Sequence, residues 1–101
     1  MRPDPYLAAI ERIRHGKAVS ARLKGYEFAA KVDMRPGASK SRWFVAIARS
    51  GSPIMFIKVA GVRGFGGPVL EITHRAAKPG SPVARIVDHY RAAGAEITEI
   101  K

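Results

Sequence analysis

The spacing of apolar residues predicts one helix near the start of the chain and another near its end. Residues 5–15, and the segment between Ser81 and Gly94, each carry apolar positions at intervals of three and four, the repeat of one helix face. These positions are Tyr6, Ala9, Ile10 and Ile13 in the first segment and Val83, Ile86, Val87 and Tyr90 in the second. A capping residue and a proline, Asp4-Pro5 and Ser81-Pro82, open the segments, and a glycine follows each one.

Between these helices the apolar residues alternate with polar ones, which predicts strands. The alternation runs through residues 19–24 and then, with opposite parity, through residues 26–34, so Lys24-Gly25 marks either a β-bulge or a tight turn. Further strands are predicted at Trp43–Arg49 and Ile54–Ala60, which form a hairpin, at Val69–Arg75 and at Glu96–Ile100. The order helix, four strands, helix, strand predicts one α+β domain over residues 1–101. We expect an antiparallel sheet of four to five strands with an N-terminal helix and a C-terminal-region helix.

The central hairpin is apolar on both of its faces. Trp43, Val45 and Ile47 have one parity, and Phe44, Ala46 and Ala48 have the other. Such strands need cover on both sides, either from helices on opposite faces or from one helix layer and an interface. We expect both helices on one face. This arrangement would leave Phe44, Ile54 and Phe56 as an interface for a homodimer or for another protein partner.

Charge adds the main indication of function. The 101 residues include 18 Lys and Arg against 8 Asp and Glu, a net charge of +10, and residues 12–42 alone hold nine bases and two acids. A charge of this size favours nucleic acid or an acidic protein surface as partner. The chain has no cysteine, which excludes disulfides, thiol catalysis and thiolate metal sites. No apolar run is long enough to cross a bilayer, so we expect a cytoplasmic protein without a membrane partner.

Two segments have the composition of phosphate-contacting loops. Residues 35–42 carry three bases, two serines and no acid. The glycine-rich connection Gly61–Pro68 adds Arg63, and its glycines would let the backbone approach a phosphate. A solvated basic loop and a flexible strand connection are the alternative interpretations of these segments. Two basic residues of the neighbouring predicted strands, Arg22 and Lys24, complete the set. The predicted nucleic-acid contacts are Arg22, Lys24, Arg35, Lys40, Arg42 and Arg63.

No catalytic motif accompanies these bases. His15, His74 and His89 lie on different predicted elements, and neither a metal-ligand spacing nor a nucleophile motif occurs. We therefore predict no catalytic residue, no metal and no cofactor. A cluster of histidine and arginine in space would change this interpretation, because a base, an acid and a cation suffice for metal-independent RNA cleavage.

These observations favour a small basic protein that binds RNA or DNA through strand and loop Arg and Lys residues, without catalysis. The first alternative is a small inhibitor or adaptor, such as phages and mobile elements encode, that binds an acidic face or the nucleic-acid channel of a larger assembly. The second alternative is a metal-independent ribonuclease toxin. The order of elements resembles that of double-stranded-RNA-binding domains, but the second helix begins Ser81-Pro82-Val83-Ala84-Arg85, with one base where those domains carry a basic run. No motif assigns the chain to a family.

Overall fold

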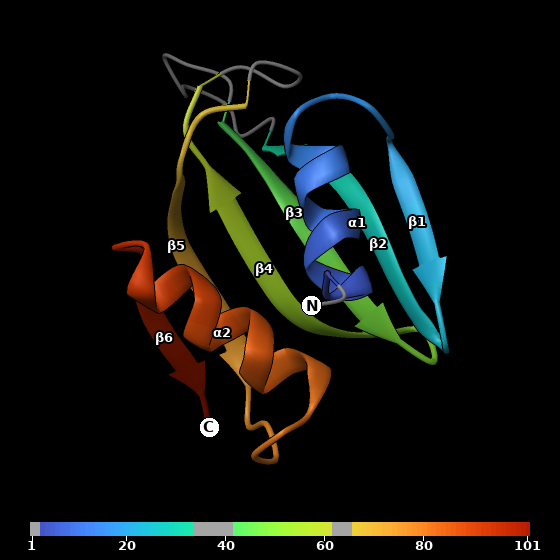
Figure 1. Ribbon diagram of the computed structural model, residues 1–101, viewed down its shortest axis with the longest axis vertical. Coiled ribbons are helices and arrows are strands. Elements are labelled where there is room, and N and C mark those ends of the chain that lie inside the picture. The colour runs from blue at the N-terminus through green and yellow to red at the C-terminus, as the bar shows by residue number, and fades with distance from the viewer. Residues whose placement is uncertain (1–2, 34–41, 62–65) are drawn as a thin grey trace.

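The computed structural model describes residues 3–33, 42–61 and 66–101, which form one six-stranded sheet and two helices (Figure 1). The elements are α1 (Pro5–Arg14), β1 (Ser20–Leu23), β2 (Tyr26–Asp33), β3 (Arg42–Arg49), β4 (Ser52–Val59), β5 (Val69–Arg75), α2 (Pro82–Ala92) and β6 (Glu96–Ile100). The strands lie side by side in the order in which they occur along the chain.

Two tight turns join β1 to β2 and β3 to β4. Lys24 and Gly25 have φ values of 46° and 85°, and Ser50 and Gly51 have values of 51° and 80°. Positive φ at both central positions defines the type I′ turn, whose twist matches that of paired strands and which favours glycine. The change of parity at Lys24-Gly25 is therefore a turn between two strands and not a bulge within one.

The α+β class and the chain positions of the two helices are as predicted, but the sheet is larger and mixed. Six strands are present instead of the predicted four to five. The sheet is also not wholly antiparallel, because β6 pairs parallel to β5, with Ile72 opposite Ile97. The parallel pairing follows from α2, which carries the chain back from the end of β5 to the starting end of the same strand.

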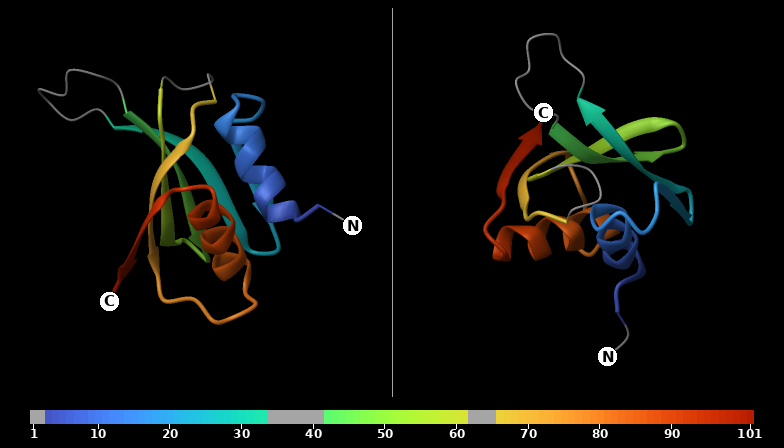
Figure 2. Two further views of the ribbon diagram at one scale, coloured as in Figure 1. Left: turned by 60° about the vertical axis from the view of Figure 1, so that its left-hand side comes forward. Right: turned by 90° about the horizontal axis from the view of Figure 1, so that it is seen from above.

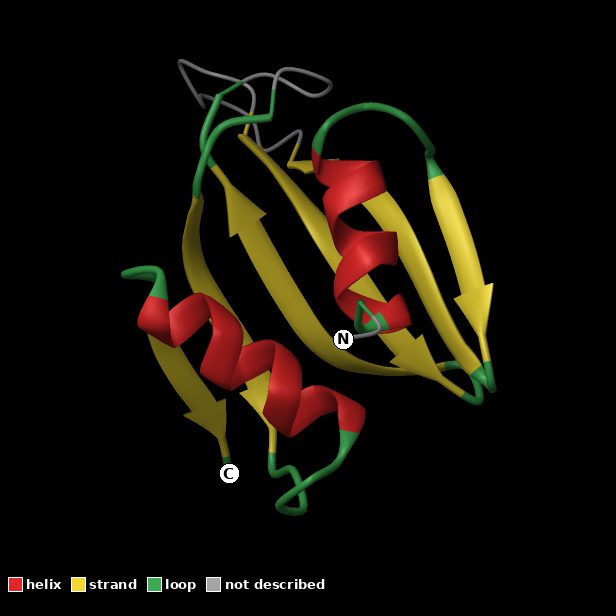
Figure 3. Cartoon of the chain, viewed as in Figure 1, coloured by secondary structure: helices red, strands yellow, loops and turns green. Residues whose placement is uncertain are grey.

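Both helices cover the same face of the sheet, so the molecule has two layers (Figures 2 and 3). The core lies between the layers. Its fully buried side chains come from α1, α2 and the helix-facing positions of β2 to β5: Ile10, Ile13, Ile86, Phe28, Trp43, Val45, Ile47, Met55, Ile57 and Ile72. The opposite face, formed by the alternate residues of the same strands, has no described helix over it and is here named the helix-free face.

The sequence signals for the two helix starts act as predicted. Asp4 caps α1 by accepting a hydrogen bond from the Tyr6 N–H at 2.9 Å, and Ser81 caps α2 by accepting one from the Ala84 N–H at 3.3 Å. Asp4 also accepts a hydrogen bond from Arg85 at 2.8 Å, which links the two helices. Neither α1 nor α2, the helices in the described parts of the chain, has the length and apolar character that a bilayer span requires.

Candidate nucleic-acid interface

The two loops with phosphate-binding composition leave the sheet at one end, here named the loop end. Residues 34–41 connect β2 to β3, and residues 62–65 lie in the connection from β4 to β5. At this end Asp33 pairs with Arg42, and Trp43, the next residue of β3, pairs with Val59 of β4. The loops therefore start from adjacent strands. Three predicted contacts, Arg35, Lys40 and Arg63, lie outside the described residues, and Arg42 is described as the first position of β3.

The other two predicted contacts lie away from the loop end. Lys24 is in the turn between β1 and β2, at the opposite end of the eight-residue strand β2, which separates it from the loop end by about 23 Å. Arg22 lies on β1, is exposed, and has its guanidinium 3.8 Å from the Glu27 carboxylate. Of the six predicted contacts, the structure thus describes three: Arg42 at the loop end, and Arg22 and Lys24 away from it.

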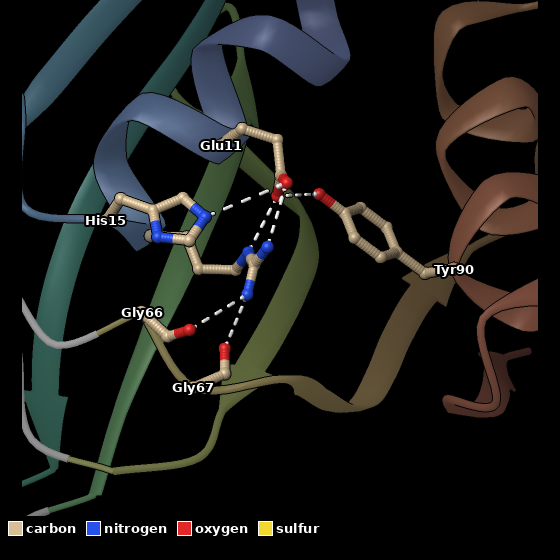
Figure 4. Close-up of polar contacts among 6 residues, drawn as sticks. Glu11, His15, Gly66, Gly67 and Tyr90 are labelled. Carbon is tan, nitrogen blue, oxygen red and sulfur yellow. Dashed lines mark hydrogen bonds and ion pairs between the residues drawn. The ribbon is translucent and has the colours of Figure 1, made fainter.

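A polar cluster ties the C-terminal turn of α1 to its surroundings near the loop end (Figure 4). Arg14 donates hydrogen bonds to both carboxylate oxygens of Glu11, at 2.6 and 2.8 Å, and to the carbonyl oxygens of Gly66 and Gly67, at 3.3 and 2.6 Å. The Tyr90 hydroxyl donates to Glu11 at 2.9 Å, which adds α2 to the cluster. The hydrogen bonds from Arg14 lower the pKa of Glu11 despite its partial burial, and that from Tyr90 lowers it further.

Close packing explains the glycines in the described part of the glycine-rich connection. A Cβ on Gly66 would overlap the His15 ring, and a Cβ on Gly67 would overlap the Ala60 carbonyl group. With Arg14 holding both of their carbonyl oxygens, these residues are fixed against α1 and the end of β4. The described glycines therefore position the connection, and no phosphate contact is needed to explain them.

The three histidines are not assembled into a catalytic group. His74 is buried in the sheet, with Nδ1 2.7 Å from the carbonyl oxygen of Arg75, whereas His89 is exposed on α2. His15 lies 3.9 Å from Glu11, but that carboxylate already accepts hydrogen bonds from Arg14 and Tyr90. Within the described residues, no group of three or more potential ligands is arranged to hold a metal ion. The hydrogen bonds of the cluster in Figure 4 therefore hold α1, α2 and the connection between β4 and β5 together, which is a structural role.

Two phenylalanines lie in contact on the helix-free face, close to the loop end. The ring centroids of Phe44 on β3 and Phe56 on β4 are 5.7 Å apart, with an interplanar angle of 72°. The strand register places Lys31 of β2 and Lys58 of β4 on either side of Phe44. These four residues are here named the aromatic platform. It presents an apolar surface between two cations.

The side chains around the aromatic platform are short next to Phe56 and acidic on the side of β5 and β6. Ala46 and Thr73 are the cross-strand neighbours of Phe56, so no long side chain stands directly beside its ring in that row. Beyond Lys58 the sign of the charge changes, because Glu71 lies 3.0 Å from Lys58 and Glu96 pairs with Glu71. The platform therefore has Lys31 on its β2 side, with Asp33 two residues further along that strand, and acidic residues on its β5 and β6 side.

The three predicted interface residues differ in exposure. Phe56 is 38% exposed and Phe44 is half-buried. Ile54 is half-buried and packs against the core, next to an irregularity in the pairing of β3 with β4. Sequence reasoning missed Lys31 and Lys58 as a pair, although both occupy helix-free positions in alternating segments. Only the register of β2, β3 and β4 shows that they flank the same phenylalanine.

A groove lies between α1 and the edge strand β1. This groove has a volume of about 400 Å³ and is lined mainly by small apolar side chains, with Arg12 and Arg22 as its charged residues. The N–H of Ala30 on β2 donates to the Val19 carbonyl oxygen at 3.0 Å. Because inward and outward residues alternate in an antiparallel pair, the backbone groups of Ser20 and Arg22 point away from β2. The groove thus adjoins an edge with outward-facing backbone groups.

Comparison with protein-family models, with curated proteins and with solved structures finds no match to this chain.

Proposed function

We propose that this protein is a small nucleic-acid-binding module that contacts phosphates at the loop end and on the helix-free face, without catalysis. The observation that carries the proposal is the common origin of the two basic loops on adjacent strands, beside Lys31 and the aromatic platform. The strand ends from which these loops leave thus lie side by side, although they are distant in the sequence. Phosphate contacts of this kind position a nucleic acid and supply most of its sequence-independent affinity.

The distribution of acidic side chains supports the proposal. Five of them are within ion-pairing distance of a lysine or arginine side chain: Asp4, Glu11, Glu27, Glu71 and Asp88. Glu96 and Glu99 have no ion pair with another described residue, and both lie on β6, across the sheet from β2. Glu27 and Asp33 are the acids of β2, and Glu27 lies within ion-pairing distance of Arg22. With 18 basic residues against 8 acids, most of the positive charge has no acid to offset it, which favours a polyanion as partner.

Salt dependence of binding tests this function. With six phosphate contacts, the slope of log K against log salt is expected to be about −5 on a duplex and about −4 on a single strand. Lys40→Ala and Arg42→Ala should each weaken binding by a similar factor on oligonucleotides of unrelated sequence, because phosphates carry no sequence information. Lys78→Ala removes an exposed charge from the opposite end of β5 and serves as the matched control. A slope near zero, or no binding at low salt, would refute the proposal.

The groove beside β1 favours a second candidate function, the binding of an extended acidic segment of another protein. Such a segment could pair with the outward backbone groups of Ser20 and Arg22, which is strand addition at a sheet edge. Arg12 and Arg22 would attract its acidic side chains. Hydrogen exchange with an added peptide of alternating glutamate and valine tests this candidate. Protection of the Ser20 and Arg22 amides is expected, and unchanged exchange at both amides would exclude the groove.

A further inference from the structure

We infer that the aromatic platform binds unpaired bases, so that the nucleic acid recognised is single-stranded. Phe56 is the stacking ring, and Lys31 binds a phosphate next to the stacked base, whereas Lys58 is ion-paired with Glu71 at 3.0 Å. This inference rests on the proposed function and deepens it. The proposed function requires phosphate contacts, which duplexes and single strands both offer, whereas the platform selects between them.

The geometry of the two rings supports stacking. Phe56 is 38% exposed and meets Phe44 edge to face, a stable aromatic arrangement that holds the Phe56 ring in place. Ala46 and Thr73, its cross-strand neighbours, are short enough to leave room for a flat base beside the ring. A base within a duplex has both of its faces covered by neighbouring bases. Stacking on a protein ring therefore requires an unpaired base, and every base offers a face for it.

The lysines favour a polyanion over a second copy of this chain. Phe44 has the exposed Lys31 on one side and Lys58, which is ion-paired with Glu71, on the other, so any ligand that covers the rings also meets the cation of Lys31. A stable protein interface buries about 800 Å² on each partner. Two phenylalanines supply at most about 500 Å² even when fully buried, and here Phe44 is already half-buried. Ile54, which could have enlarged the apolar area, packs against the core.

The acidic side of the platform sets the direction of the bound strand. Glu71 and Glu96 lie beyond Lys58, on β5 and β6, and repel phosphates. Lys31 lies on the other side of Phe44, two residues before the end of β2 from which the basic loop leaves. The strand is therefore expected to run from Phe56 across Phe44 to Lys31, away from Glu71 and Glu96.

Three labelled oligonucleotides of equal length test the inference: a mixed-sequence single strand, its duplex, and an abasic strand that keeps the phosphates. The wild type should bind the single strand more tightly than the abasic strand. Phe56→Leu, which keeps an apolar side chain but removes the ring, should weaken single-strand binding by about 5- to 150-fold and leave abasic binding unchanged. Phe56→Trp, which keeps an aromatic ring at this position, should bind the single strand with an affinity within about threefold of wild type.

Each other outcome has a defined meaning. Equal binding of single and abasic strands, unaffected by Phe56→Leu, would overturn the stacking role while nucleic-acid binding stands. Failure of every oligonucleotide to bind at low salt would remove the proposed function, and this inference with it. Sedimentation analysis tests self-association. If the wild type is a dimer and Phe56→Leu is a monomer with unchanged single-strand affinity, the platform is an interface between copies of the chain, and the inference is overturned. Leu70→Ala removes another exposed apolar side chain and is the control.

Discussion

The two faces of the sheet are built from alternate residues of the same strands, yet they have different chemistry. On β4, Ile57 is 0% exposed beneath the helices, while its neighbour Phe56 is 38% exposed on the helix-free face. The covered face consists of large aliphatic and aromatic side chains that contact both helices. The helix-free face combines two aromatic rings with alanine, threonine, lysine and glutamate. One strand thus contributes to stability with one half of its residues and is available for binding with the other half.

The largest expected effect separates the two faces by stability. Ile57→Ala leaves a cavity in the core and should lower the free energy of unfolding by about 2–5 kcal/mol. Phe56→Leu on the same strand should cost well under about 1.5 kcal/mol, because the side chain is already partly hydrated. Urea denaturation followed by the fluorescence of Trp43, which is buried in the core, measures both variants. Equal costs would show that the helix-free face is covered in solution.

An intermediate effect is expected in the helix layer, at the tether of Glu11, Arg14 and Tyr90. Glu11→Gln loses a charge-assisted pair with Arg14 and should cost about 1–2 kcal/mol at neutral pH. Because the folded state lowers the pKa of Glu11, its contribution to stability is present above the ordinary value of 4.5 and is lost as pH falls through the lowered pKa. Wild type and Glu11→Gln should therefore converge in stability as the solution is acidified. Stability curves of wild type and Glu11→Gln that stay parallel on acidification would contradict the tether.

The smallest expected effect concerns one cation of the helix-free face. Lys31→Ala should reduce the steepness of the salt dependence of single-strand binding by about 0.7, the contribution of one phosphate contact. The variant should unfold like wild type, since Lys31 is exposed. Lys78→Ala carries the same change in net charge and should leave the slope at its wild-type value. Equal slopes for the two variants would place the phosphates elsewhere on the molecule.

The sequence was sufficient to predict the helices because their signals are local. Asp4-Pro5 and Ser81-Pro82 cap the helices through contacts within one turn, and the apolar stripes have one period. The strands were less completely predictable. A change of parity at Lys24-Gly25 is compatible with a bulge or a turn, and only the backbone φ values distinguish them. The parallel pairing of β6 depends on where α2 returns the chain, which no local pattern specifies.

The candidate site was predictable in composition but not in arrangement. The basic loop of residues 35–42 is evident from the sequence, as is the apolar character of both faces of the hairpin that carries Phe44 and Phe56. Their relation to Lys31 and Lys58 depends on strand register, because a shift of one residue moves every side chain to the other face. The glycines before β5 have the composition of a phosphate-binding loop, but Gly66 and Gly67 are explained by contact with His15 and Ala60. Self-association through Phe44, Ile54 and Phe56 stays a prediction.

The order of the strands in the sheet also has a consequence for how the chain folds. Strands that follow one another in the chain are neighbours in the sheet, and two of these pairs are joined by tight turns. Loop-closure entropy is smallest for the contacts next to these two turns, and it grows with the separation of the paired residues along the chain. The two type I′ turns can start hairpin formation on the microsecond timescale. β6 reaches its place beside β5 only after α2 has formed. Docking of this last strand is therefore expected to complete folding, after the antiparallel part of the sheet and its helix-free face have already formed.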